Sequence, residues 1–234
     1  TIELQAYTGI LHEEFALRTQ IEEIDAGIES LYYDLWVPLA AFSRMEADDK
    51  NRKDIEYVLN ETINLLDLRT PYSESFYQSV EEASSYIRKA LYEDMAGYGD
   101  VIATCIGHTH IDVAWWWTVA QTREKVGRSF ATVLKLMDEY PGYKFMSSQP
   151  QLYAFLKERY PELYEKVKQR IKEKRWEPEG GMWVEADCNL TSGESLVRQF
   201  MHGKRFFKEE FGVDNRILWL PDVFGYSGAL PQIM

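Results

Sequence analysis

Apolar residues recur every three or four positions along most of the first hundred residues, with charged residues between them. This spacing is typical of amphipathic helices and predicts three of them, over residues 11–44, over 52–68, and following the capping residue Ser73. An alternating stretch over residues 1–9 predicts a strand before the first helix. We therefore expect residues 1–100 to form a mainly helical segment that leads into the next domain.

The pattern changes after residue 100, where short apolar runs alternate with stretches of helical periodicity. The first run contains Cys105, is rich in β-branched residues and predicts a fully buried strand. Alternating strands and helices predict a parallel α/β sheet, either open or closed into a barrel. The predicted strands cover residues 101–107, 144–146, 175–184 and 216–220, and the helices cover 117–140, 147–174 and 192–211.

Polar or aromatic side chains follow each predicted strand at its carboxyl end. In parallel α/β folds this edge of the sheet is where active sites are built. Chance would scatter such residues over both edges, so the distribution favours an enzyme. The four groups lie at residues 108–112, 147–149, 185–187 and 221–226.

The first of these groups predicts a metal site. If the backbone stays extended, the two-residue period places His108, His110 and Asp112 on one side. Imidazole nitrogen and carboxylate oxygen suit a divalent ion such as zinc. Asp222 could supply a third ligand, although an Asp at a strand-to-helix junction is also an ordinary helix cap or turn residue.

Aromatic residues beside this group indicate a ligand with apolar faces, such as a sugar. Trp115, Trp116 and Trp117 are consecutive, so they point in different directions and cannot all face one core. At least one should project toward the strand ends, unless all three pack inside a large barrel. Glu185 and Asp187 share one face of an extended segment, where they either bind hydroxyl groups or flank a turn.

Charge and composition argue against some classes of binding partner. The 234 residues include 38 acidic and 26 basic ones, a net charge of −12, which argues against nucleic acid and anionic membrane surfaces. Two cysteines are too few for a disulfide framework. Because no hydrophobic run reaches transmembrane length and no signal segment opens the chain, we expect a cytoplasmic location.

Four motifs together resemble glycoside hydrolase family 38, the zinc-dependent α-mannosidases, and particularly its bacterial and cytosolic or vacuolar branch. They cover residues 108–115, 180–189, 192–200 and 219–227. The resemblance implies that residues 101–234 form the first half of a seven-stranded β/α-barrel catalytic domain. It also extends, with less distinctive motifs, over the helical segment that precedes the barrel.

The resemblance also implies roles for individual residues. His110 and Asp112 match the zinc-binding pair, and Asp222 matches the carboxylate that is both zinc ligand and nucleophile. His108 lies outside the zinc motif. The positions that match the sugar-binding contacts are Trp115, Phe224 and Asp187.

The implied reaction is hydrolysis of terminal α-mannosides with retention, through a covalent glycosyl-enzyme on Asp222. The family's fourth zinc ligand, a histidine, and its acid/base aspartate are expected beyond Met234. We therefore expect the 234-residue chain alone to be inactive and to bind zinc weakly or not at all. A mannosylglycerate hydrolase, a metal-dependent carbohydrate deacetylase and a non-enzymatic carbohydrate-binding domain stay open as alternatives, as does homo-oligomer formation in the full-length protein.

Overall fold

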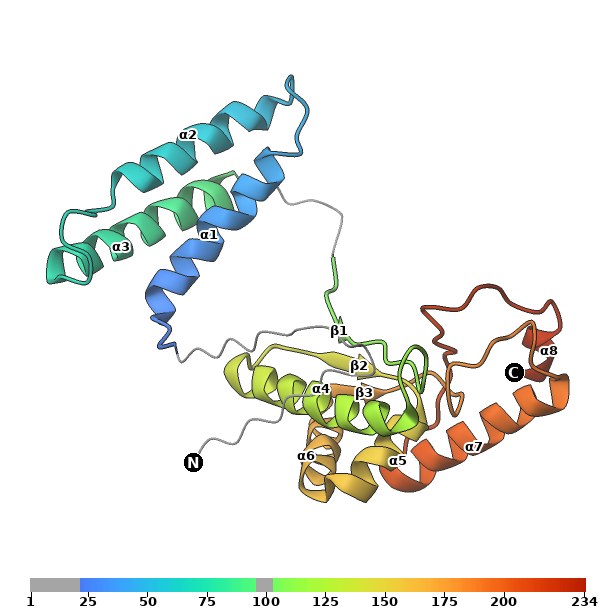
Figure 1. Ribbon diagram of the computed structural model, residues 1–234. Coiled ribbons are helices and arrows are strands. Elements are labelled where there is room, and N and C mark those ends of the chain that lie inside the picture. Colours follow the sequence, from blue (N-terminus) through green and yellow to red (C-terminus); the bar gives the residue numbers. More distant parts are fainter. Residues whose placement is uncertain (1–21, 96–102) are drawn as a thin grey trace. The chain divides into compact units, whose positions relative to one another are not determined.

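The computed structural model describes residues 22–95 and 103–234 (Figure 1). The predicted strand over residues 1–9 lies outside these ranges. The chain divides into two compact units, Thr1–Ile102 and Ala103–Met234, each with its own buried clusters. Within the described residues, no helix is both long and apolar enough to cross a membrane.

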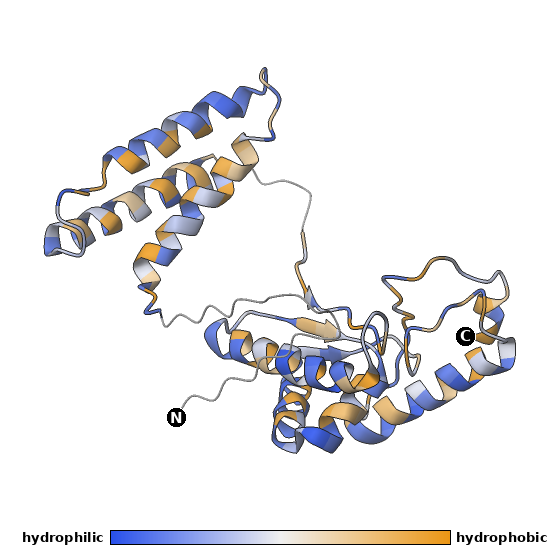
Figure 2. Cartoon of the chain, viewed as in Figure 1, coloured by the Kyte–Doolittle hydropathy of each residue, from blue (hydrophilic) through white to orange (hydrophobic). Residues whose placement is uncertain are grey.

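The described part of the first unit consists of helices. Asp25, Asp49 and Ser73 each accept backbone N–H groups of the turn that follows them, which fixes where three helices begin. The capping role predicted for Ser73 is confirmed. Of the first predicted helix, residues 11–44, the described part is helical from Ala26 to Phe42, and residues 11–21 lie outside the described ranges. Apolar residues lie along the sides where the helices pack together (Figure 2). The elements are α1 (Ala26–Phe42), α2 (Lys50–Asn64), α3 (Glu74–Ile87) and the π-helical turn η1 (Arg88–Asp94).

The second unit is a mixed α/β structure around a small parallel sheet. Its three strands lie in the order β1-β2-β3, and each connection between them contains helix, because parallel neighbours need a crossover. The strands are β1 (Gly107–His108), β2 (Phe145–Ser147) and β3 (Trp176–Pro178). The helices are α4 (Val119–Glu139), α5 (Pro150–Arg159), α6 (Pro161–Lys172), α7 (Gly193–Phe211) and α8 (Leu230–Ile233).

Local signals set the helix ends in this unit. Thr118 and Gln121 form a capping box at the start of α4, and Ser192 caps α7 as predicted. The single helix predicted over residues 147–174 is instead two helices, α5 and α6. The break falls at Pro161, which has no N–H to donate and forces the preceding residue, Tyr160, out of helical geometry.

The sheet rests on an aromatic core. Trp176 of β3 is 1% exposed, and its indole N–H donates to the hydroxyl of Tyr153 over 2.8 Å. That hydroxyl in turn donates to the carbonyl of Ser147 over 2.9 Å, so the buried polar atoms of both rings are satisfied. Phe130 of α4 and Phe207 of α7 pack edge-on against this pair. The core therefore fixes the carboxyl ends of β2 and β3 against the surrounding helices.

The buried first strand predicted over residues 101–107 is not observed in its described part. Only Gly107 and His108 pair, with β2 on one side, while Cys105 and Ile106 are exposed. A parallel strand is buried only when neighbours and helices cover it, and no described element covers residues 103–106. Of the two cysteines, Cys188 is the buried one.

The fourth predicted strand, residues 216–220, is reduced to one parallel bridge between Leu218 and Gly180. The ladder cannot extend along β3 because Pro178 lacks an N–H. Gly180 and Gly181 then turn the chain through positive φ angles of 121° and 74°. The segment nevertheless lies beside β3, as a fourth strand of the sheet would.

Candidate functional site

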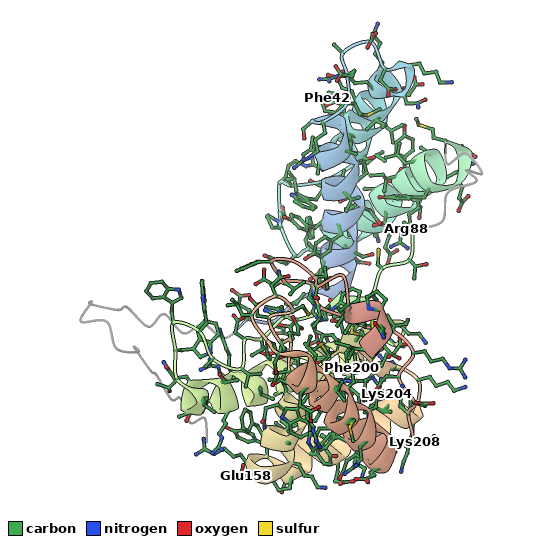
Figure 3. The ribbon with its side chains drawn as sticks, turned by 90° about the vertical axis from the view of Figure 1, so that its right-hand side faces the viewer. Phe42, Arg88, Glu158, Phe200, Lys204 and Lys208 are labelled. Carbon is green, nitrogen blue, oxygen red and sulfur yellow. The ribbon has the colours of Figure 1, made fainter. Side chains whose placement is uncertain are left out.

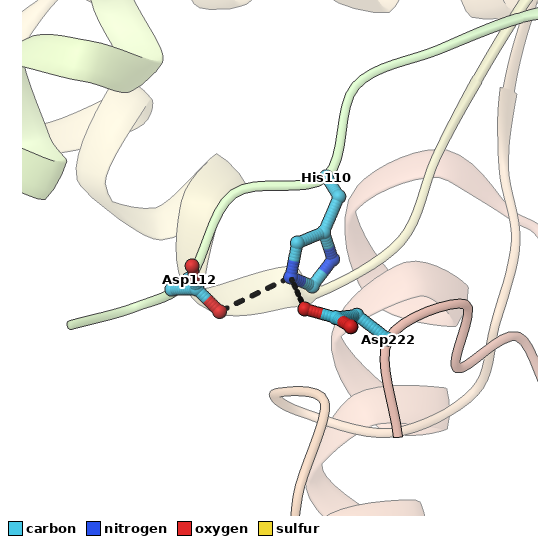
Figure 4. Close-up of side chains that lie close together, drawn as sticks. All are labelled: His110, Asp112 and Asp222. Carbon is cyan, nitrogen blue, oxygen red and sulfur yellow. Dashed lines mark hydrogen bonds and ion pairs between the residues drawn. The ribbon is translucent and has the colours of Figure 1, made fainter. Parts of the chain in front are cut away.

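Three acidic and imidazole side chains meet at the carboxyl edge of the sheet. His110 and Asp112 follow β1, and Asp222 follows the segment that pairs with Gly180 (Figure 4). Nε2 of His110 lies 3.1 Å from Oδ1 of Asp112 and 3.7 Å from Oδ2 of Asp222. The structure thus brings together the three residues that the sequence predicted to share one metal.

The donor set of these residues fits a zinc ion. One ligand atom from each residue lies within 4.8 Å of the others. Two ligands bound tetrahedrally to zinc at ~2.0–2.2 Å are about 3.4 Å apart, and the observed 3.1 Å and 3.7 Å lie on either side of that spacing. Among the described residues, four carboxylates and no Lys or Arg line the surrounding cleft, which favours a cation electrostatically.

The other ring nitrogen of His110 faces a carboxylate that the sequence did not assign to it. Nδ1 lies 3.0 Å from Oε2 of Glu185, whose side chain is 9% exposed. Burial raises the pKa of Glu185, although contacts with His110 and Ser148 oppose this effect. Burial alone would lower the pKa of His110, but the carboxylates of Glu185 and Asp112 raise it above its usual value.

Gln149, which follows β2, forms hydrogen bonds with residues that follow β1 and β3. It is 3% exposed and has a left-handed backbone with φ of 63°, which is uncommon for a residue other than glycine. Its Nε2 donates to the carbonyl of Ile111 over 2.9 Å, and its Oε1 accepts the backbone N–H of Glu185 over 3.2 Å. No motif in the sequence pointed to this role, because it depends on three separate segments meeting.

His110, Asp112 and Asp222 lie in an open cleft of about 400 Å³. This volume is within the range of ~300–1,000 Å³ that is typical of small-molecule sites. Two aromatic residues that the resemblance placed at the sugar lie on its wall: Trp115 is 70% exposed and Phe224 is 90% exposed. The lining consists of His110, Asp112, Val113, Ala114, Trp115, Gln149, Val184, Glu185, Asp187, Asp222, Val223 and Phe224.

The three consecutive indoles do face different surroundings. Trp117 packs against α4, where its N–H donates to Thr122 over 3.0 Å and its ring contacts the ammonium group of Lys125. Trp115 and Trp116 remain exposed, and Trp115 alone of the three lines the cleft. The expectation that at least one indole projects toward the strand ends is therefore met by Trp115.

Asp187 both lines the cleft and shapes a turn. Its Oδ1 accepts the backbone N–H groups of Leu190 and Asn189, each over 2.8 Å. These two hydrogen bonds lower the pKa of Asp187. Asp187 therefore flanks a turn, which was one of the two roles that the sequence left open for it. The turn hydrogen bonds use Oδ1 and do not involve Oδ2.

His108 lies outside the three-residue cluster. Its Nε2 accepts a hydrogen bond from the indole N–H of Trp219 over 3.2 Å. Burial and the nearby His110 lower the pKa of His108, which favours the neutral ring that this contact requires. Through this hydrogen bond, His108 of β1 links that strand to the fourth segment, which is a structural role.

The fold and the cluster define an α/β protein with a candidate metal centre at the carboxyl edge of its parallel sheet. Residues 100–234 match the family described as "Glycosyl hydrolases family 38 N-terminal domain". The chain belongs to glycoside hydrolase family 38, as the sequence motifs indicated.

Several curated relatives are α-mannosidases by name. The chain is 42% identical over 183 residues to "Alpha-mannosidase G" of Dictyostelium discoideum, covering 78% of this chain and 16% of that protein. It is 36% identical over 226 residues to "Alpha-mannosidase" of Saccharomyces cerevisiae, covering 89% of this chain and 20% of that protein. It is also 36% identical over 217 residues to "Alpha-mannosidase 2C1" of Homo sapiens, covering 93% and 20%. The chain thus spans only 16% to 20% of the length of these relatives.

Proposed function

We propose that the protein is a zinc-dependent, retaining α-mannosidase that acts on terminal α-D-mannosides in the cytoplasm. The observation that carries the proposal is the meeting of His110, Asp112 and Asp222 in one cleft. The cleft lies within the segment that matches the family. The mannoside itself is suggested by the names of the relatives.

Asp222 is the proposed nucleophile. Its Oδ2 is directed at His110, and with 58% of the side chain exposed, Oδ1 remains available to an electrophilic carbon in the cleft. Attack on the anomeric carbon forms a covalent glycosyl-enzyme and breaks the bond to the leaving group, and water then releases mannose with retention. A zinc ion held by His110, Asp112 and Asp222 would supply positive charge to bind mannose hydroxyl groups.

Trp115, Phe224 and Asp187 complete the proposed sugar site. Exposed aromatic rings on the cleft wall offer apolar faces to the C–H side of a sugar ring. Oδ2 of Asp187 can accept a hydrogen bond from a sugar hydroxyl, because the turn uses only Oδ1.

We also propose that residues 101–234 form the first half of a seven-stranded barrel, preceded by the helical segment of residues 1–100. In a flat sheet, β1 and the fourth segment would lie three strand spacings apart, about 14 Å. The hydrogen bond between His108 and Trp219 joins the residues of these two segments directly. Such a contact supports a sheet that curls, as a barrel requires.

The test is covalent trapping of the nucleophile in the full-length protein. A 2-fluorinated mannosyl fluoride should label the peptide that contains Asp222, and NMR should show α-mannose as the first product. Asp222→Asn should lower kcat for an aryl α-mannoside by at least ~10³-fold, which corresponds to about 4 kcal/mol.

Asp214→Asn is the matched control, since Asp214 lies in the loop after α7 and pairs with Lys204 outside the cleft. Release of acetate from an acetylated sugar without any glycosyl-enzyme would identify a deacetylase and refute the proposal. Unchanged kcat in Asp222→Asn would exclude Asp222 as the nucleophile.

A further inference from the structure

We propose that Glu185 is the positioning residue of the metal centre, fixing the ring orientation and tautomer of His110 through its Nδ1. This inference rests on the proposed function, because it concerns how the proposed zinc ligand is held. It adds a fourth acidic residue to the site, with a role that differs from those of Asp112, Asp187 and Asp222.

The first support is the contact itself. Nδ1 of His110 and Oε2 of Glu185 lie 3.0 Å apart, although the two groups are not ideally aligned as a hydrogen bond. Both atoms are fully buried, and neither has a hydrogen-bond partner elsewhere in the described part of the chain. A buried polar atom without a partner is costly, so a proton on Nδ1 shared with Oε2 satisfies both atoms at once.

The second support is the position of Nε2, the other nitrogen of the His110 ring. Nε2 lies 3.1 Å from Oδ1 of Asp112, within hydrogen-bond distance, and 3.7 Å from Oδ2 of Asp222. With the proton on Nδ1, the lone pair of Nε2 would be free for a cation held between these three atoms, in place of the hydrogen bond to Asp112. Neutral imidazole with a free Nε2 is the form that binds zinc. In metal sites generally, a carboxylate on the second ring nitrogen fixes the tautomer and increases ligand basicity.

The third support is that Glu185 is itself held in place. Its Oε1 accepts hydrogen bonds from the hydroxyl of Ser148 over 3.0 Å and from Nε2 of Gln149 over 3.4 Å. The backbone N–H of Glu185 donates to Gln149, and the same amide holds the carbonyl of Ile111, the residue after His110. Glu185 and His110 are therefore anchored by the same buried side chain.

The experiment measures the metal alone and does not depend on turnover. In the full-length protein, Zn²⁺ affinity is determined by competition with a chromophoric chelator, and Co²⁺ is bound as a spectroscopic probe. Glu185→Gln should weaken zinc binding by about 10–100-fold and shift the visible Co²⁺ spectrum, because the neutral amide makes a weaker partner for Nδ1–H. Glu185→Ala should weaken binding further, and Glu185→Asp should recover part of the loss.

Glu177→Gln is the matched control, an exposed glutamate on β3 changed in the same way. It should leave the affinity and the spectrum unchanged. Thermal unfolding of the metal-free proteins separates a folding defect from a metal effect, and Glu185→Gln should unfold close to the wild type.

Wild-type affinity and an unchanged Co²⁺ spectrum in Glu185→Gln would overturn the role of Glu185 and leave the proposed function intact. Equal loss in Glu185→Gln and Glu177→Gln would overturn it as well. If the wild-type protein bound no zinc through His110, both this inference and the proposed zinc dependence would fail.

Discussion

Trp115 and Trp116 are neighbours in the chain with different surroundings. Their rings meet edge to face with centroids 5.9 Å apart, and both are largely exposed, at 70% and 79%. Only Trp115 lines the cleft that contains His110 and Asp222. Only the ring of Trp115 could therefore cover a sugar bound in the cleft, as proposed above.

Trp115→Ala should lower kcat/KM for an aryl α-mannoside about tenfold, or about 1.4 kcal/mol of transition-state stabilisation. The reason is the loss of the aromatic face against the sugar ring. Steady-state kinetics of the full-length protein measures the change. Trp116→Ala is the control and should stay within twofold of the wild type, while equal effects of the two substitutions would contradict a specific contact at Trp115.

Helix α7 holds the segment that carries Glu185. The carbonyl and side-chain oxygens of Gln199 accept the backbone N–H groups of Trp183 and Val184 over 3.0 Å and 2.9 Å. Gly203 lies between Phe200 and Lys204, both labelled on this helix in Figure 3. Because Gly203 has no Cβ, the backbone of α7 can approach the backbone of residues 181–183 closely, and this approach allows the hydrogen bonds.

Gly203→Ala should destabilise the fold by about 1–3 kcal/mol, as overpacking of a tight contact does. The added Cβ would lie 2.2 Å from the carbonyl oxygen of Gly181 and 2.8 Å from the backbone nitrogen of Trp183, and neither can rotate away. Urea unfolding measures the loss. Gly193→Ala, at the first turn of the same helix with no atom within 4 Å, is the control and should not destabilise the protein.

Glu210 connects three helices of the second unit. It pairs with Lys157 of α5 and accepts a hydrogen bond of 2.6 Å from the hydroxyl of Tyr164 of α6, while lying on α7 itself. Burial acts in the opposite direction, but the ammonium group and the hydroxyl together lower the pKa of Glu210.

Glu210→Gln should reduce the free energy of unfolding by about 1 kcal/mol at pH 7, a value discounted because Lys157 is half exposed. A carboxyl whose pKa is lower in the folded state stabilises it above its unfolded pKa, and this stabilisation disappears as pH falls through the folded value. The difference between wild type and variant should therefore shrink as the pH falls below the ordinary pKa of a glutamate and vanish below the lowered pKa of Glu210. Glu209→Gln, at the adjacent exposed position, is the control and should leave the free energy of unfolding at pH 7 unchanged.

The three proposed zinc ligands come from segments that are far apart in the chain. His110 and Asp112 follow the first strand, whereas Asp222 follows the last extended segment of the described chain. An ion bound between them would link the two ends of the second unit. Zinc should therefore stabilise the folded state as well as the substrate complex.

Removal of zinc should destabilise the full-length protein. At a zinc concentration one hundred times the dissociation constant, binding adds about 2.7 kcal/mol to the free energy of unfolding. Thermal unfolding with zinc and with excess chelator measures the difference, and His110→Ala should abolish it. The same midpoint with zinc and with chelator would contradict a metal centre in this protein.

The local signals in the sequence predicted the helices better than the strands. Ser73 and Ser192 cap helices as expected, because a cap and the apolar period act within a few residues. The predicted strands at 101–107 and 216–220 are shorter than expected, since strand length depends on partners elsewhere in the chain.

The sequence by itself determined which chemistry the site contains. The identities of His110, Asp112 and Asp222, and their position after apolar runs, were enough to predict that they meet, because the carboxyl ends of parallel strands share one edge. Only the tertiary structure decided that Glu185 faces His110, that Gln149 holds both, and that Trp115 lines the cleft while Trp116 does not. These contacts join distant segments, and their geometry is set by how the core packs, which no local pattern encodes.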